Sequence, residues 1–324
     1  MAAAAEPILV VDDLNVSFDT RDGELRAVRG LDFALYPGET LGIIGESGAG
    51  KSQAVLAVLG LLPTNGRATG SARYRGRELI GMPGSELNAV RGARIALVFQ
   101  DPMSSLNPYL RIRTQMVEVL AHHAGLRGVE ARRRAVAMLE AVRIPDAVRV
   151  LERYPHEFSG GMRQRVMIAM ALLCDPDILV ADEPTTALDV TVQAQVLEIL
   201  RDLQRSRGIA TLLITHDLGV VAGQCDRVLV MYAGRIVESG SVDGIFNQPQ
   251  HPYTADLLRS IPRLDRQGRL NAIAGDPPDP MLAPPGCPYA PRCSHRFERC
   301  DRERPLLGAR LSGAAACHLD AAGD

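Results

Sequence analysis

The amino-acid sequence predicts an α/β fold with a mostly parallel sheet and helices on both of its faces. One reason is that short apolar runs, typical of buried strands, alternate with segments whose apolar residues recur every three or four positions. A second is that a glycine-rich segment, residues 45–50, lies between one such strand and one such helix. The chain has 324 residues, which is enough for one large domain or two moderate ones.

The elements follow this alternation after an N-terminal part made of strands and turns. Residues 8–44 are expected to form that part, which is an antiparallel β region. Helices dominate from about 103 to 175, which predicts a helical insert. The expected strands are 8–11, 14–18, 31–35, 40–44, 95–99, 178–181, 210–215 and 227–232. The expected helices are 52–59, 115–123, 130–142, 161–173 and 192–205.

The sequence changes character after about residue 248, which predicts a main domain over 1–248 and an extension over 249–324. Seven prolines lie between residues 276 and 292, and four of the six cysteines lie between 287 and 317. A segment so rich in proline has few residues with which to build a core. We therefore expect a small, irregular, cysteine-rich extension.

Bulk properties exclude several classes of protein. The net charge of −2 and the pI near 6.4 argue against a dedicated nucleic-acid-binding protein. The longest apolar run, residues 54–62, is shorter than the ~20 residues that a membrane-spanning helix needs. The first residues lack a basic segment followed by an apolar core, so no secretion signal is expected.

Residues 45–52 read Gly-Glu-Ser-Gly-Ala-Gly-Lys-Ser and fit the phosphate-binding pattern G-x-x-x-x-G-K-[ST] at every position. Lys51 is the only lysine among 36 basic residues. Its compact ammonium group can reach phosphate oxygens inside a tight loop, whereas a planar guanidinium is too wide. Because a strand precedes the motif and a helix follows it, we favour a nucleoside triphosphate site over a chance glycine-rich turn. The candidate nucleotide-binding residues here are Gly45, Ser47, Gly48, Ala49, Gly50, Lys51, Ser52 and Gln53.

A second nucleotide-related feature is the segment 177–184, Asp-Ile-Leu-Val-Ala-Asp-Glu-Pro. Its apolar residues predict a buried strand that ends at two carboxylates. Asp182 is a candidate ligand of Mg²⁺, together with the Ser52 hydroxyl, and Glu183 is a candidate for polarising the water that attacks the γ-phosphate. The alternative is a strand that ends in two solvated acids.

The third feature is Ser159-Gly160-Gly161, a turn that opens a predicted helix and offers a hydroxyl and free amides to an anion. Alone, it would be interpreted as an ordinary helix N-cap. In order with the other two motifs, it makes the chain resemble the ATP-binding subunits of ABC transporters, whose signature is usually Leu-Ser-Gly-Gly-Gln. Phe158 and Met162 occupy the outer positions, while the Ser-Gly-Gly core is intact.

The resemblance implies an ABC-type nucleotide-binding domain with a P-loop NTPase fold, and it assigns roles to further residues. Gln100 matches the Q-loop, which contacts Mg²⁺ or the attacking water. Residues 187–189, ending in Asp189, match the D-loop at the dimer seam. His216 matches the switch histidine that contacts the γ-phosphate; alone, it would be interpreted as a surface imidazole.

The resemblance also implies how ATP is bound and used. Two such domains meet head to tail, and each ATP lies between the phosphate loop of one and the Ser-Gly-Gly turn of the other. An aromatic residue stacks on adenine in this family. Phe18 is the candidate, with Tyr36 and Phe33 as nearby alternatives. Hydrolysis opens the dimer, and the movement reaches a membrane subunit through the Gln100 loop and the helical insert.

Residues 249–258, Pro-Gln-His-Pro-Tyr-Thr-Ala-Asp-Leu-Leu, and the cysteine-rich segment resemble the oligopeptide/dipeptide importers, a subfamily that includes nickel and glutathione systems. The resemblance implies a peripheral subunit at the cytoplasmic face of the inner membrane. Its implied partners are a second, different ATPase subunit, two permease subunits and an extracytoplasmic solute-binding protein. The alternatives are a soluble ABC ATPase of translation or DNA repair, which usually has two nucleotide domains or a long coiled coil, and a metabolic kinase, which lacks the Ser-Gly-Gly turn.

Cys287, Cys293, Cys300 and Cys317 have the spacing C-x₅-C-x₆-C-x₁₆-C. Thiolates around a metal centre would organise a segment that cannot form a core. Zn²⁺ is one alternative, but paired C-x₂-C knuckles are absent, and free thiols are another. Four cysteines also suit a [4Fe–4S] cluster, with which the importer relatives that share this spacing are associated. Cys174 and Cys225 are expected to be small buried residues of the main domain.

Overall fold

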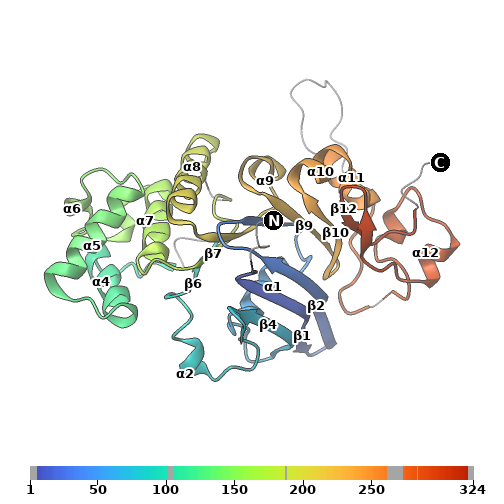
Figure 1. The fold of residues 1–324 in the computed structure, drawn as a ribbon, viewed down its shortest axis with the longest axis horizontal. Helices are drawn as coiled ribbons and strands as arrows, with labels where there is room; N and C mark the ends of the chain where they lie inside the picture. The colour runs from blue at the N-terminus through green and yellow to red at the C-terminus, as the bar shows by residue number, and fades with distance from the viewer. Residues whose placement is uncertain (1–5, 101–104, 187, 261–272, 283, 320–324) are drawn as a thin grey trace. The chain divides into compact units, whose positions relative to one another are not determined.

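The computed structural model describes residues 6–100, 105–186, 188–260, 273–282 and 284–319 (Figure 1). Its contacts divide the chain into two compact units. The first, here called the helical unit, comprises Met1–Ile8, Leu35–Thr40 and Met82–Leu213. The second, here called the loop unit because it contains the glycine-rich loop, comprises Leu9–Ala34, Leu41–Gly81 and Ile214–Asp324.

In the helical unit, three strands lie side by side in the order β8 (Ala210–Ile214), β7 (Ile178–Asp182) and β6 (Ile95–Val98). β6 and β7 are parallel, with Ile95 opposite Ile178. All five residues of β8 are buried, as are the first four of β7, which explains their continuous apolar sequence. The helices of this unit are α2 (Gly84–Leu87), α4 (Ile112–His123), α5 (Gly128–Ala141), α6 (Ala147–Val150), α7 (Gly160–Leu172) and α8 (Val190–Arg207), with the 3₁₀ helix η1 (Pro155–Glu157).

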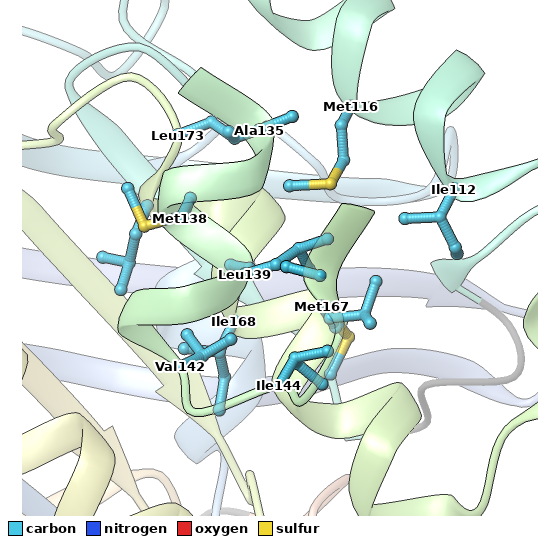
Figure 2. Close-up of a cluster of buried hydrophobic side chains, with 14 of the residues drawn as sticks. Ile112, Met116, Ala135, Met138, Leu139, Val142, Ile144, Met167, Ile168 and Leu173 are labelled. Carbon is cyan, nitrogen blue, oxygen red and sulfur yellow. The ribbon is translucent and has the colours of Figure 1, made fainter. Parts of the chain in front are cut away.

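The predicted helical insert packs into a hydrophobic core that it shares with β6, β7 and α8, and Figure 2 shows part of this core. In α5, Ala131, Ala135, Met138 and Leu139 are all buried, and their spacing of four, three and one places them on one face of the helix. Met116 of α4 and Ile168 of α7 belong to the same cluster. The apolar periodicity in the sequence therefore corresponds to the helix faces that meet in this core.

The loop unit contains a four-stranded sheet in the order β2 (Gly23–Leu35), β1 (Leu9–Thr20), β4 (Gly66–Tyr74) and β5 (Arg77–Glu78). β1 and β4 are antiparallel, with Leu9 opposite Tyr74 and Phe18 opposite Gly66. The two strands expected over 8–11 and 14–18 are one continuous strand. The register shift between Asp12 and Asn15 interrupts its alternation, which is why the sequence looks like two runs.

A second group of strands in the loop unit has the order β11 (Gly308–Arg310), β12 (Gly313–Ala315), β10 (Arg235–Ser241), β9 (Arg227–Tyr232) and β3 (Thr40–Ile44). β3 and β9 are parallel, with Ile43 opposite Leu229, whereas β10 and β12 are antiparallel. The C-terminal residues expected to be irregular thus add two short strands to this sheet. Their sequence, rich in glycine and alanine, has no strand pattern that would have predicted them.

The helices of the loop unit are α1 (Lys51–Val58), α9 (Leu218–Gln224), α10 (Val242–Asn247), α11 (Pro252–Arg259) and α12 (Glu298–Arg302), with the 3₁₀ helix η2 (Ala290–Arg292). Tyr253 and Tyr289 of the C-terminal extension belong to the same hydrophobic cluster as Ile44 and Val230. The extension is therefore packed into the core that underlies the glycine-rich loop. Among the residues that the structure describes, no helix is both long enough and apolar enough to cross a membrane.

Candidate nucleotide-binding site

The glycine-rich loop joins the end of β3 to the start of α1, as its sequence predicts. Gly45 and Gly50 have φ angles of +151° and +96°, which favour glycine. A Cβ atom on Gly45 would lie 2.2 Å from the Met231 carbonyl oxygen, and one on Gly50 would lie 2.3 Å from that of Ala27. Only glycine fits at these two positions, so the loop is held tightly at both ends.

Lys51 is buried, and its side chain turns back into the loop. Its Nζ donates hydrogen bonds to the carbonyl oxygens of Gly45 at 2.8 Å and Glu46 at 3.0 Å. The half-buried Ser52 follows in the first turn of α1. The ammonium group is thus already inside the loop where anionic phosphates would bind, so this cradle fits a nucleoside triphosphate.

A cavity of about 730 Å³ lies beside the loop, a size typical of small-molecule sites. Phe18 lines it together with loop residues, whereas Phe33 is buried in the core. A Cβ on Gly66 would lie 2.8 Å from Cε1 of Phe18, so glycine at 66 makes room for this ring. The loop-unit residues of the predicted site that line the cavity are Phe18, Ser47, Gly48, Ala49, Gly50 and Gln53.

Four arginines and two acidic residues, Glu46 and Asp279, line the cavity, so its lining has a net positive charge, and it also contains an unsatisfied acceptor. Arg26, Arg29, Arg235 and Arg304 line it, and burial, reinforced by repulsion from Arg304 and Arg29, lowers the pKa of Arg235 to about 10. This residue therefore stays charged at neutral pH. Within the described part of the chain, the Gln53 Oε1 atom is buried without a hydrogen-bond partner. Both features suit an anionic ligand that brings its own hydrogen-bond donors.

In the helical unit, the predicted catalytic carboxylate is already oriented. Glu183 directly follows β7, and its Oε2 accepts hydrogen bonds from Gln100 Nε2 at 3.0 Å and from Thr186 Oγ1 at 2.9 Å. Its φ angle of +47° is uncommon for a residue other than glycine, so the turn after the strand has a special conformation. Asp182 ends β7 beside it and is half-buried. The role of Thr186 was not predicted from the sequence, in which its only signal is its position three residues after Glu183.

The Ser-Gly-Gly turn also lies in the helical unit, and it is displayed on the surface. Ser159 and Gly160 are exposed, and Ser159 caps α7 through an Oγ atom that accepts from the Met162 amide at 3.4 Å. A Cβ on Gly161 would lie 2.4 Å from Cγ1 of Val192, so glycine lets α7 approach α8. Phe158 is buried, which explains why one large apolar residue can replace another at this outer position.

Two further predicted residues lie at the starts of helices or the ends of strands. Asp189 caps α8, with its Oδ1 accepting from the Val192 amide at 3.0 Å, whereas Ala187 lies outside the described residues. His216 is exposed and lies two residues after β8, in the loop unit. The structure therefore brings Gln100 to Glu183 and Phe18 to the glycine-rich loop, while the Ser159 turn and His216 form separate parts of the predicted site.

The four cysteines of the extension line one small cavity, together with His251, His295 and His318. Burial raises the pKa of the Cys287 thiol to about 11, and it also raises the pKa of the Cys293 and Cys317 thiols. These thiols are therefore protonated at neutral pH unless a metal replaces the protons. Within the described ranges, no group of three or more His, Cys, Asp or Glu side chains is arranged to hold a metal ion.

Comparisons with known proteins agree with this geometry. Residues 28–186 match the family model described as ABC transporter, and residues 237–300 match the one described as oligopeptide/dipeptide transporter, C-terminal region. The chain is 55% identical over 314 residues to the oligopeptide transport ATP-binding protein OppD of Salmonella typhimurium, an alignment that covers 97% of this chain and 94% of that protein. It is 51% identical over 303 residues to the dipeptide transport ATP-binding protein DppD of Bacillus subtilis, with 93% and 90% covered.

The solved structures that resemble the chain include the ATP-binding cassette MJ0796 in a dimeric, post-hydrolysis state bound to ADP and Pi. It aligns with a TM-score of 0.65 and 25% identity, covering 72% of this chain and 98% of that one. The predicted fold class, an α/β P-loop NTPase of the ABC type, is confirmed by this likeness and by the family matches. The chain belongs to the ATP-binding subunits of ABC transporters, in the oligopeptide/dipeptide group.

Proposed function

We propose that this chain is the ATP-hydrolysing subunit of a membrane ABC importer of peptides and works by ATP-driven dimerisation of nucleotide-binding domains. The observation that carries the proposal is the glycine-rich loop with Lys51 folded into it, in a chain 55% identical to an oligopeptide transport ATP-binding protein. The domain over 1–248, with its helical subdomain over about 103–175, does the chemistry. The extension over 249–324 is the second part of the chain.

Each predicted residue has a distinct task in binding and hydrolysis. The amides of residues 45–51 and the Lys51 ammonium hold the β- and γ-phosphates, and Phe18 stacks on adenine. Mg²⁺ neutralises phosphate charge when bound, and Ser52, Gln100 and Asp182 are the residues that would hold it.

Glu183 takes the proton of the attacking water at its carboxylate, which the hydrogen bonds from Gln100 and Thr186 hold in one orientation. His216 contacts the γ-phosphate, and its position two residues after β8 supports this role. The exposed Ser159-Gly160-Gly161 turn is suited to meet the ATP of a partner subunit, with Asp189 at the seam between the two.

The proposed partners follow from membership of the importer group. The chain acts with a second, different ATPase subunit, two permease subunits and an extracytoplasmic solute-binding protein, at the cytoplasmic face of the inner membrane. The solute is recognised by those partners, so the same machinery would serve nickel or glutathione in place of peptides. Co-purification of the native complex with its bound solute identifies which solute it carries.

Replacing Glu183 should separate hydrolysis from binding. Glu183→Gln keeps the size of the side chain and an oxygen acceptor for Gln100 and Thr186, but it removes the base. We expect ATP turnover to fall roughly a hundredfold or more, with ATP binding retained and a closed dimer trapped. Lys51→Ala should instead raise the Kd for ATP about tenfold or more, because charge-assisted hydrogen bonds are lost. Wild-type turnover by Glu183→Gln would show that Glu183 is not the base.

Enlarging Ser159 should impair the ATP site that the partner chain mostly builds. Ser159→Arg places a long side chain where the partner's phosphates would lie, and we expect turnover at that site to fall roughly a hundredfold. Ser85→Arg, at an exposed serine of α2, is the matched control and should leave turnover unchanged. The measurement is ATPase activity of the complex with permeases, with one ATPase subunit substituted at a time. A fully active complex that contains only this ATPase chain would contradict the heterodimer.

The extension is proposed to hold a [4Fe–4S] cluster on Cys287, Cys293, Cys300 and Cys317, with Zn²⁺ as the alternative. Support comes from the single cavity that all four side chains line. Anaerobically purified protein should absorb visible light and contain about four iron atoms per chain. Cys300→Ser should abolish the absorbance, whereas Cys174→Ser, outside the extension, should not. A colourless protein that contains one zinc ion per chain would support the Zn²⁺ site instead of the cluster. Four titratable thiols in a metal-free protein would exclude both the cluster and the Zn²⁺ site.

A further inference from the structure

Glu46, the second residue of the glycine-rich loop, forms an ion pair with Arg292 of the C-terminal extension. Both terminal guanidinium nitrogens take part: Nη1 donates to Oε2 at 2.8 Å, and Nη2 donates to Oε1 at 3.0 Å. The Arg292 side chain is only 5% exposed and that of Glu46 is 24% exposed. A bidentate pair at this depth is shielded from water and from salt, unlike the exposed pairs elsewhere on the surface.

Hydrogen bonds and aromatic rings hold the Arg292 side chain in place. Its Nε donates to the Ala274 carbonyl oxygen at 2.9 Å, and Nη1 also contacts the Tyr232 hydroxyl at 3.2 Å. The guanidinium carbon lies 5.8 Å from the centre of the Tyr232 ring and 5.9 Å from that of Tyr289. Because these partners fix its orientation, Arg292 presents a preformed fork to Glu46.

The backbone of Glu46 is fixed from the same extension. Its amide donates to the Tyr253 hydroxyl at 2.9 Å, and Tyr253 is fully buried in α11. The Tyr253 and Tyr289 rings are 5.3 Å apart, and the Tyr289 hydroxyl donates to Asp256 at 2.6 Å. Both the side chain and the backbone of Glu46 are therefore anchored by residues of 249–324.

Glu46 also contacts the residue that binds phosphate, because its carbonyl oxygen accepts from Lys51 Nζ. A carboxylate in a phosphate-binding loop repels an anionic ligand unless a cation compensates it. Arg292 is the cation that forms this bidentate pair with the carboxylate. Removing the Arg292 guanidinium would leave the negative charge of Glu46 uncompensated in the phosphate-binding loop. It would also remove contacts that fix the shape of this loop.

We propose that Arg292 is a positioning residue for ATP binding: it neutralises and orients Glu46 and thereby makes the ATP affinity of the loop depend on the C-terminal extension. This inference rests on the proposed role of residues 45–52 in binding ATP. It assigns the extension a direct part in the nucleotide site of its own chain.

The test is the Kd of the full-length chain for a fluorescent ATP analogue. Arg292→Met keeps an unbranched, flexible side chain and removes the guanidinium with its charge, and it should raise the Kd by roughly five- to tenfold. Glu46→Gln alone removes the repelling charge together with the pair, so it should raise the Kd less than Arg292→Met does. The double variant Arg292→Met/Glu46→Gln should recover most of the affinity, since no unpaired carboxylate is left.

Controls distinguish the expected increase in Kd from a loss of folding and from an error in the proposed ATP site. Arg299→Met breaks an exposed pair with Glu303 in the same extension and should leave the Kd unchanged. Lys51→Ala should weaken ATP binding in the wild type and in each of the Arg292 and Glu46 variants. An unchanged Kd in Lys51→Ala would contradict the proposed ATP site itself. If Arg292→Met does not fold, as judged by thermal melting, Arg292→Gln replaces it in the same cycle.

The rescue is the decisive readout, because a purely structural Arg292 predicts a different pattern. In that case the double variant would bind ATP as weakly as the weaker single variant, or more weakly. An unchanged Kd in folded Arg292→Met, or no recovery in the double variant, would overturn the proposal.

Discussion

The backbone of residues 45–50 passes so close to two other segments that only glycine fits at either end. The missing Cβ atoms of Gly45 and Gly50 let the loop lie against the carbonyl oxygens of Met231 and Ala27, although these segments are far apart in the sequence. This close approach fixes the loop amides and the position of Lys51, whose ammonium group the loop carbonyls hold. The electropositive cavity and the ion pair of Glu46 with Arg292 are both arranged around it.

Each unit contributes its own part of the machinery. The loop unit carries the groups proposed to bind ATP: the glycine-rich loop, Phe18 and an extension whose Tyr253 and Arg292 hold Glu46. The helical unit carries the groups proposed for hydrolysis and partner contact: an oriented Glu183 after β7 and an exposed turn at Ser159 that caps α7. The carboxylate is held by side chains of its own unit, Gln100 and Thr186.

The local sequence pattern was sufficient to predict the helices and strands whose apolar residues repeat regularly. The strands 40–44 and 227–232 have the predicted bounds, and helices such as 130–142 differ by one or two residues. The pairing of β12 with β10 was not predictable, because it joins residues about 75 apart in the sequence through a strand of glycine and alanine. The Glu46–Arg292 ion pair could not be predicted for the same reason, because nothing in the sequence around Arg292 indicates a partner so far away in the chain.

The most direct measurement of the central claim is hydrogen–deuterium exchange of the full chain with and without Mg-ATP. If the fixed loop is the nucleotide site, ATP should slow exchange at the amides of residues 45–53, where phosphates accept their hydrogen bonds. Exchange in α5 (Gly128–Ala141), within the helical core, should stay the same. Bound ATP that leaves residues 45–53 exchanging at their original rates would contradict the account.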